Sequence, residues 1–120
     1  MVSVFWVFVG GGLGSLCRYG IARLISPIAG GFPYATLIAN VLSCILLGYL
    51  VGLSVRGQMA GAYKLFLMTG FCGGFSTFST FSNESYSLLQ SGQYAMAVAN
   101  IGGSILLGLV CIYIGLRLSV

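Results

Sequence analysis

The chain has 120 residues, of which 58% are hydrophobic and only 5% are charged. Soluble domains carry roughly 25% charged residues, so this composition excludes an ordinary water-exposed globule and favours a protein embedded in a lipid bilayer. The net charge is +4, but the basic residues are scattered, which argues against nucleic-acid binding and favours anchoring at lipid headgroups. These residues are Arg18, Arg23, Arg56, Lys64 and Arg117.

Four stretches are long and apolar enough to cross the hydrocarbon core, which needs ~20 helical residues. We expect these spans over about 4–25, 34–54, 63–89 and 94–116. The first link carries a cluster of helix breakers, namely Ser26, Pro27, Gly30, Gly31 and Pro33. Because the links are short, neighbouring helices are antiparallel. The sequence therefore predicts an all-α integral membrane protein, with residues 1–120 forming one domain of four transmembrane helices.

Glycine makes two of these spans irregular. The first contains Gly10-Gly11-Gly12 and then Gly14, and the third contains Gly70 and Gly73-Gly74 followed by a polar run. In the hydrocarbon region, non-helical backbone survives only where protein or water satisfies its polar groups. We therefore predict that the third helix is broken and that the break is functional. A close helix contact through small residues is the alternative.

The basic residues are divided weakly between the two ends of the predicted bundle. Arg56, Lys64 and Arg117 fall on the side of the N-terminus, whereas Arg23, with Arg18 deeper in its span, falls toward the other side. Such a weak bias allows insertion in both directions under the positive-inside rule. It is compatible with an antiparallel, dual-topology homodimer.

Aromatic and polar residues alternate in the third span. Phe75, Phe78 and Phe81 recur at a step of three, so we expect them on one face of the helix. A polar stripe beside them contains Thr77, Thr80 and Glu84. Hydroxyl and amide donors can replace the water shell of an anion, and the edges of aromatic rings carry partial positive charge. This pattern suits a narrow path for a small, strongly hydrated anion. The alternative is that the rings face lipid and the hydroxyls bond to their own helix.

The same stretch carries a family resemblance. Residues 70–84, Gly-Phe-Cys-Gly-Gly-Phe-Ser-Thr-Phe-Ser-Thr-Phe-Ser-Asn-Glu, resemble the G-F-x-G-G-[LF]-[ST]-T-F-S-[ST]-[FW] signature of the Fluc/CrcB fluoride channels. The glycine-rich stretch over 10–19 and the Ala-Thr-Leu-Ile-Ala-Asn pattern over 35–40 are similar to the same family. The resemblance covers essentially the whole chain. It implies a fluoride-selective passive channel of the plasma membrane (the inner membrane of a bacterium), a dual-topology homodimer with two pores, and a central structural sodium ion.

The resemblance also implies roles for individual residues. The ion pathway would be lined by Asn40, Phe78, Phe81, Thr80 and Ser104. Sodium would be held by backbone carbonyls of Gly73 and Ser76 from both subunits. Carbonyls freed at a helix break are hard ligands at an electronegative helix end, and the lack of a nearby carboxylate disfavours a divalent ion. Gly108 departs from relatives that have a hydroxyl there, which puts the extent of the polar track in question.

Two charged residues keep open roles. Arg18 could attract anions near a vestibule or form a dimer-stabilising bond to backbone carbonyls, and the structural role ranks first. Glu84, the only acid of the chain, could complete a buried polar network, pair with Arg18 or another base, or lie at the membrane interface. Asn40 could either line a pore or form interhelical hydrogen bonds, and the family favours the pore.

Other classes of membrane protein fit less well. A four-helix exporter similar to the small multidrug resistance family needs a carboxylate in its first span, and this span has none. A non-transporting membrane subunit is a third class and predicts no ion flux from the protein alone. An enzyme is not expected, because the chain has no histidine, no paired carboxylates and no nucleophile with a base. The expected partners are fluoride, a second copy of the chain and the bilayer, without nucleic acid.

Overall fold

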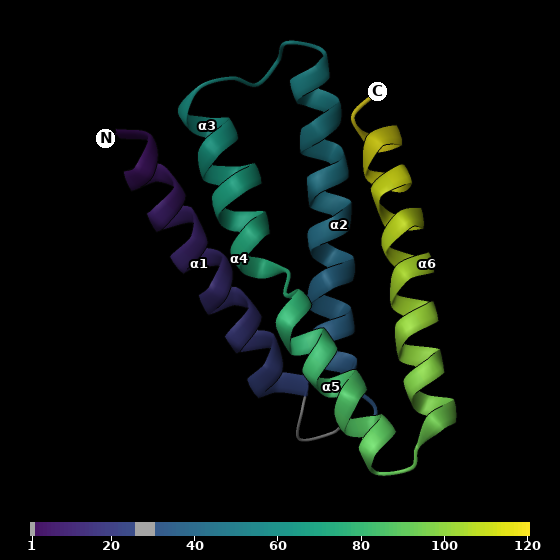
Figure 1. The fold of residues 1–120 in the computed structure, drawn as a ribbon. Helices are drawn as coiled ribbons and strands as arrows, with labels where there is room; N and C mark the ends of the chain where they lie inside the picture. Colours follow the sequence, from purple (N-terminus) through teal and green to yellow (C-terminus); the bar gives the residue numbers. More distant parts are fainter. Residues whose placement is uncertain (1, 26–30) are drawn as a thin grey trace.

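A computed structural model describes residues 2–25 and 31–120, and every element within them is helical (Figure 1). The predicted breakers Ser26, Pro27 and Gly30 lie outside the described residues. In the third predicted span, three short helical pieces, α3, η2 and α4, follow one another along the chain. The middle piece, η2, is a π-helix, whose turns are wider than those of an α-helix. The elements are α1 (Val2–Ile25), α2 (Tyr34–Val55), α3 (Ala62–Lys64), η2 (Leu65–Cys72), α4 (Gly73–Phe75), α5 (Phe78–Gln90) and α6 (Tyr94–Leu118).

Three helices, α1, α2 and α6, are long and apolar enough to cross a membrane, and they contain the predicted spans over 4–25, 34–54 and 94–116. The stretch predicted as the third span is not one helix, because it is divided between α3, η2, α4 and α5. The predicted break in the third span is therefore confirmed within the described residues. The first predicted span differs from expectation, since α1 continues through all of its glycines.

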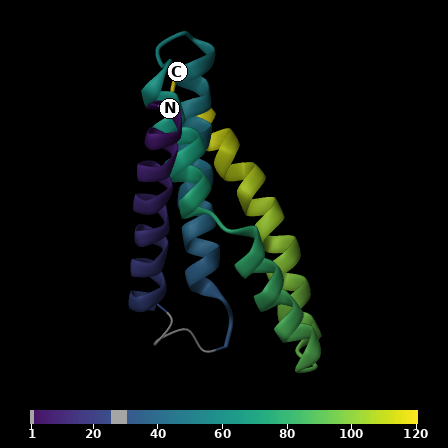
Figure 2. The same ribbon diagram turned by 60° about the vertical axis from the view of Figure 1, so that its left-hand side comes forward.

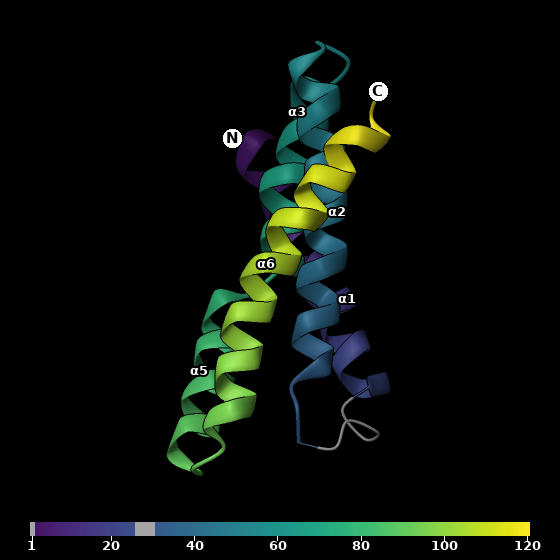
Figure 3. The same ribbon diagram turned by 90° about the vertical axis from the view of Figure 1, so that its right-hand side faces the viewer.

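The elements pair in two groups. The helix formed by α3, η2 and α4 lies along α1, whereas α5 lies along α6, and α2 packs against α6 (Figures 1 and 3). Figure 2 shows how the chain after α4 turns away from α1 and continues toward α6 as α5. Both ends of the chain and the link after α2 lie at the same end of the molecule (Figure 1).

Glycine allows α1 to approach the first half of the third span closely. A Cβ atom added at Gly10 would overlap the carbonyl oxygen of Phe66, and one added at Gly14 would overlap that of Phe71. The contact is therefore made between backbones, the arrangement that small residues permit in membrane helix pairs. The close-contact alternative holds for Gly10 and Gly14 of the first span, but not for Gly12, whose added Cβ would have nothing within 4 Å.

The pairing of α2 with α6 follows the same rule. Gly48 and Gly115 leave no room for a Cβ, because each faces backbone of the other helix. At the end of α2, Gly52 lies against Ser119, and the Arg56 guanidinium donates a hydrogen bond of 2.5 Å to the Ser119 carbonyl. Both helix pairs thus bring backbone close to backbone at these glycines.

Candidate functional site

The third span breaks at two extended residues. Ser76 has ψ 154°, and Thr77 has φ −148° and ψ 118°, so neither continues the helix that ends at Phe75. Thr77 begins the next helix as its N-cap, where its Oγ1 accepts the backbone N–H of Thr80 at 3.2 Å. A Ser or Thr cap of this kind stabilises a helix start by satisfying one orphan donor.

Side chains from α1 and α2 bond to some of the backbone groups near the break. In a continuous helix the N–H of Thr77 would donate to the carbonyl of Gly73. Here it donates to Asn40 Oδ1 at 2.9 Å, while Asn40 Nδ2 donates to the Thr77 carbonyl at 3.5 Å. Arg18 Nε donates to the Gly74 carbonyl at 3.1 Å. Asn40 therefore makes an interhelical bond, and Arg18 bonds to a backbone carbonyl of the same chain, while the roles of both residues in an ion pathway stay predictions.

The Ser76 hydroxyl points back into its own helix. It donates to the Cys72 carbonyl at 2.9 Å, and the Ser43 hydroxyl from α2 donates to the same carbonyl at 3.2 Å. For Ser76, the alternative of bonding to its own helix is therefore correct. The Ser76 side chain therefore stabilises the backbone next to the break, and the other polar groups there come from the backbone and from neighbouring residues.

A cavity of about 290 Å³ lies directly after the break, between α2, α5 and α6. It brings together four of the five predicted pathway residues, Asn40, Phe78, Phe81 and Ser104. The remaining lining is Leu37, Val41, Cys44, Ser76, Thr77, Ile105 and Gly108. The wall is thus largely apolar, with an amide and a few hydroxyls as its polar groups. No charged residue lines it among the described residues.

The phenylalanines do not share one helical face. Phe78 and Phe81 have ring centroids 6.0 Å apart with planes at 41°, and both line the cavity. Phe75 lies before the break, where it is 7% exposed and stacks with Phe71 instead. The expected single face is wrong because the extended residues between Phe75 and Phe78 reset the helical phase.

Thr80 lies apart from the aromatic pair. It lines a smaller cavity of about 130 Å³, together with Arg18 and Thr36, and does not line the larger one. Its Oγ1 accepts a hydrogen bond from Thr77 Oγ1 at 3.2 Å. The larger and smaller cavities are therefore on different sides of α5. The larger one is lined by aromatic rings, and the smaller one is lined by a cation and hydroxyls.

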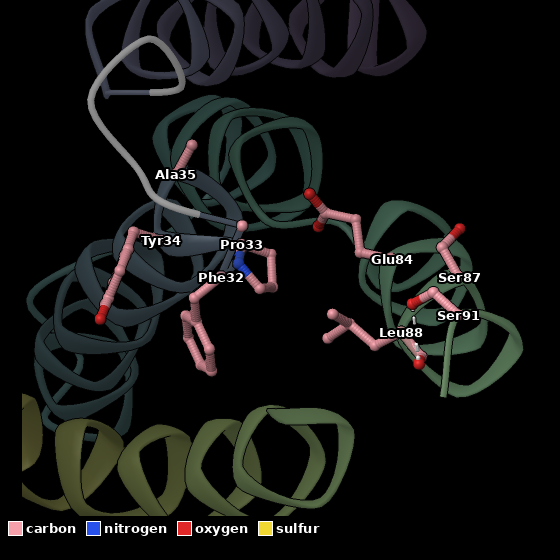
Figure 4. Close-up of a pocket in the computed structure, with 9 residues that line it drawn as sticks. Phe32, Pro33, Tyr34, Ala35, Glu84, Ser87, Leu88 and Ser91 are labelled. Carbon is pink, nitrogen blue, oxygen red and sulfur yellow. Dashed lines mark hydrogen bonds between the residues drawn. The ribbon is translucent and has the colours of Figure 1, made fainter. Parts of the chain in front are cut away.

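Glu84 lines a third hollow of about 440 Å³ between the start of α2 and α5. Figure 4 shows Glu84 and Leu88 projecting from α5 toward Phe32 and Pro33. One carboxylate oxygen, Oε1, is buried without a hydrogen-bond partner among the described residues. The pairing with Arg18 that the sequence left open is not found there, since Arg18 bonds to the Gly74 carbonyl.

Comparison with known proteins agrees with this architecture. The family described as "CrcB-like protein, Camphor Resistance (CrcB)" matches residues 5–116. The chain belongs to this family. Fluoride-specific ion channel FluC from Pyrococcus horikoshii is 46% identical over 94% of this chain and 92% of its own length. FluC from Thermus thermophilus is 44% identical over 94% and 91%, and FluC from Flavobacterium psychrophilum is 42% identical over 99% and 98%.

Membership of the CrcB family, together with three apolar helices long enough to span a bilayer, identifies a multi-pass membrane protein. The curated relatives are ion channels by name, so the family gives no support for an enzyme. Their organisms include Pyrococcus and Thermus species, and a bacterial inner membrane is only one setting for such a protein.

Two polar residues near the larger cavity, Asn100 and Ser85, were not singled out from the sequence. Asn100 on α6 is 2% exposed, and its Nδ2 donates to the Oγ of Ser85 on α5 at 2.9 Å. Ser104 Oγ, one turn along α6, donates to Asn100 Oδ1 at 3.4 Å. An asparagine within an apolar span was the available signal, because an amide at that depth needs partners.

Proposed function

We propose that this CrcB-family chain is a passive, fluoride-selective channel. Its relatives carry the name of fluoride-specific ion channels at 42–46% identity over nearly their full length. The observation that supports the proposal most within the molecule is the cavity that joins Phe78 and Phe81 to Asn40 and Ser104. Aromatic edges, an amide and a hydroxyl on an apolar wall are a donor set for a small anion.

The chemistry of that wall accounts for selectivity and for release. Small hydrogen-bond donors and ring edges can replace the compact hydration shell of fluoride better than the looser shell of a larger halide. No fixed cation lines this cavity among the described residues, so the anion is not trapped there. Fluoride that enters a cell as its neutral weak acid dissociates inside, and a passive pathway lets the anion leave along the membrane potential.

The working unit in this proposal is an antiparallel homodimer with two pores. A single chain leaves Phe78 79% exposed, so one wall of its cavity is open. A second copy related by a two-fold axis would cover both open cavities in the same way. The weak division of basic residues between the two ends is compatible with insertion in both directions.

Labelling of single cysteines tests the dual topology. The native Cys17 is exposed and Cys44 lines the cavity, so both are first replaced by serine, whereas Cys72 and Cys111 are buried. A cysteine is then introduced at the exposed Gln58 in the link after α2. We expect an impermeant thiol reagent to label about half of the protein from each side of the membrane. Labelling from one side only would end the dual-topology proposal.

A structural sodium ion is the proposed cofactor, and the break fits it. The carbonyl of Gly73 loses its helical donor because the Thr77 N–H is bonded to Asn40. This carbonyl lies at the electronegative end of the helix that terminates in α4. Gly73 is exposed and nothing lies within 4 Å of its added Cβ, which leaves the space open to a partner subunit. Gly73 and Ser76 carbonyls from two subunits would hold the ion as hard ligands.

Flux from purified protein is the direct test of function. Proteoliposomes containing only this chain are loaded with fluoride or with chloride, and efflux is started by a potassium ionophore. We expect rapid fluoride efflux and chloride efflux at the level of protein-free vesicles. Comparable rates for the two anions would contradict the proposal, and so would fluoride retention by vesicles shown to contain folded dimers.

A further inference from the structure

Asn100 makes two side-chain hydrogen bonds near the larger cavity, one to Ser85 on α5 and one from Ser104 within α6. Asn100 is 2% exposed and its partner Ser85 is 4% exposed, so the bond of 2.9 Å between Nδ2 and Oγ is shielded from solvent and lipid. A buried amide is stabilised only when its polar atoms are paired, because an unpaired buried donor or acceptor keeps its full desolvation penalty. Asn100 therefore fixes α5 against α6 (Figure 3).

The Ser85–Asn100 bond is connected on both sides to residues that line the cavity. Ser85 follows Phe78 and Phe81 by seven and four residues, the spacing of one helical face. Ser104 follows Asn100 by four residues and donates its hydroxyl proton to Asn100 Oδ1. One amide thus connects the helix that carries the aromatic pair with the hydroxyl on the opposite wall.

We propose that Asn100 is a positioning residue of the ion pathway, which sets the direction of the Ser104 hydroxyl and the spacing of α5 from α6. The inference rests on the proposed fluoride function. A serine hydroxyl has one proton, and an anion needs that proton directed at it. At 3.4 Å the bond from Ser104 to Asn100 is longer than the common 2.7–2.8 Å for O–H···O bonds, so it is readily exchanged.

Because the Ser104 proton can exchange between two acceptors, Asn100 Oδ1 and the anion, the hydroxyl has two stable directions. Without an anion, the Ser104 proton points to Asn100 Oδ1. When fluoride reaches the cavity, the proton turns to the ion, and the amide stays in place because its Nδ2 remains bonded to Ser85. The hydroxyl therefore binds the anion against a competing acceptor. This competition keeps binding weak enough for the ion to leave.

Fluoride efflux from proteoliposomes compares Asn100→Leu with the native chain and with Asn83→Leu, a control at an exposed asparagine of α5. Leucine has a similar size but neither donates nor accepts, so we expect fluoride flux to fall about tenfold, the effect of losing roughly one hydrogen bond. Ser85→Ala should lower the flux less, and it should have no further effect in the Asn100→Leu background because the two residues act through one bond.

Asn100→Asp supplies a readout that a purely structural role would not give. When ionised, a carboxylate at this position cannot donate to Ser85, and it repels the anion. When protonated it can donate to Ser85 and accept from Ser104, as the amide does. We therefore expect its fluoride flux to be low near pH 7.5 and to recover as the pH falls to about 5.5. Protein-free vesicles at each pH correct for leakage of neutral hydrogen fluoride.

The native chain is the baseline for that pH profile. The titratable neighbours of Ser85 on α5 are Glu84 and Tyr86, and Cys44 lines the cavity from α2. All three are present in both proteins, so a profile seen only in Asn100→Asp belongs to the introduced carboxyl. We expect a flat native profile over this range.

The outcomes separate the inference from the function on which it rests. Absence of fluoride flux in the native chain overturns the proposed function before any variant is compared. With a conducting native chain, native flux in both Asn100→Leu and Ser85→Ala overturns the positioning role. A pH-independent Asn100→Asp flux does the same. If Asn100→Leu does not assemble, Ser85→Ala and the Asn100→Asp profile decide, since both retain a polar group or a small residue at the contact.

Discussion

The two halves of the third span differ in what they contact and in what their sequence supplies. Before the break, η2 and α4 lie against α1 so closely that Gly14 faces the Phe71 carbonyl and Gly74 faces that of Gly11. After the break, α5 carries serines, a threonine and a glutamate, and it packs along α6 instead of α1. The first half is apolar and closely packed, whereas the second is amphipathic and lines cavities on more than one side.

This difference shows how a single span can combine anchoring with a pathway. Backbone contact through glycine fixes the first half, so that the break occurs at a constant position in the bundle. The second half is then free to present polar groups, because its starting point is held by Asn40 and by the Thr77 cap. Substitutions in the two halves should therefore fail in different ways, the first by loss of assembly and the second by loss of flux.

The largest effect is expected at the anchoring contact. A methyl group in Gly14→Ala would overlap the Phe71 carbonyl and lie 2.8 Å from the Phe75 nitrogen. Overpacking against backbone should cost about 3 kcal/mol and remove most of the folded protein. Gly12→Ala is the matched control, because nothing lies within 4 Å of its added Cβ. Gel filtration in detergent measures the outcome, and equal profiles for the two variants would contradict the anchoring role.

Two substitutions at the proposed sodium site, where the two halves meet, distinguish a backbone carbonyl from a side-chain hydroxyl as the ligand. A Cβ at Gly73 meets nothing within 4 Å in a single chain, so a loss in Gly73→Val would point to the partner subunit or to the ion between them. We expect this variant to abolish fluoride flux. Ser76→Ala should keep most of it, because that hydroxyl bonds only to the Cys72 carbonyl. The opposite order would identify the hydroxyl, rather than the carbonyl, as the ligand.

In the second half, the aromatic pair should control flux without controlling assembly. Phe78→Ile and Phe81→Ile keep apolar bulk but remove the positive ring edge, and we expect each to lower fluoride flux at least about tenfold. Phe75→Ile is the control from the first half, where the ring is 7% exposed and outside the cavity. Normal flux in both cavity variants, with dimers intact by gel filtration, would return these rings to a lipid-facing role.

The smallest effect concerns the start of α5. Thr77→Val removes the oxygen that accepts the Thr80 N–H, and loss of such a cap costs about 1 kcal/mol. Thr77→Ser keeps the oxygen and should retain most of the stability. Thermal unfolding in detergent compares the two variants. A serine variant as unstable as the valine variant would show that the methyl group, and not the cap, is the important feature.

The sequence predicted the three long apolar helices and the break in the third stretch because both depend on local composition. Apolar length places the spans, and glycines followed by a polar run place the break near Gly73. Helical periodicity failed across the break, since two extended residues separate Phe75 from Phe78 and change the direction of every side chain that follows. Periodicity is valid only within one uninterrupted helix.

Contacts between residues that are distant in the chain also could not be predicted from local sequence patterns. The bond from Asn100 to Ser85 joins two helices, and the placement of Thr80 beside Arg18 depends on how α5 is rotated about its axis. Neither is determined by spacing in the sequence. The polar character of Asn100 was visible in α6, but its partner depended on the packing of α5 against α6.

The bonds made by Asn40 and Arg18 also limit how far the 70–84 stretch can be transplanted. The irregular geometry is supported from α1 and α2, so the stretch is not a self-contained module. A synthetic peptide of residues 70–84 in detergent micelles should relax to one continuous helix, detectable as unbroken helical chemical shifts by NMR. Grafting the pathway into a designed membrane bundle would therefore require copying Asn40 and Arg18 along with it.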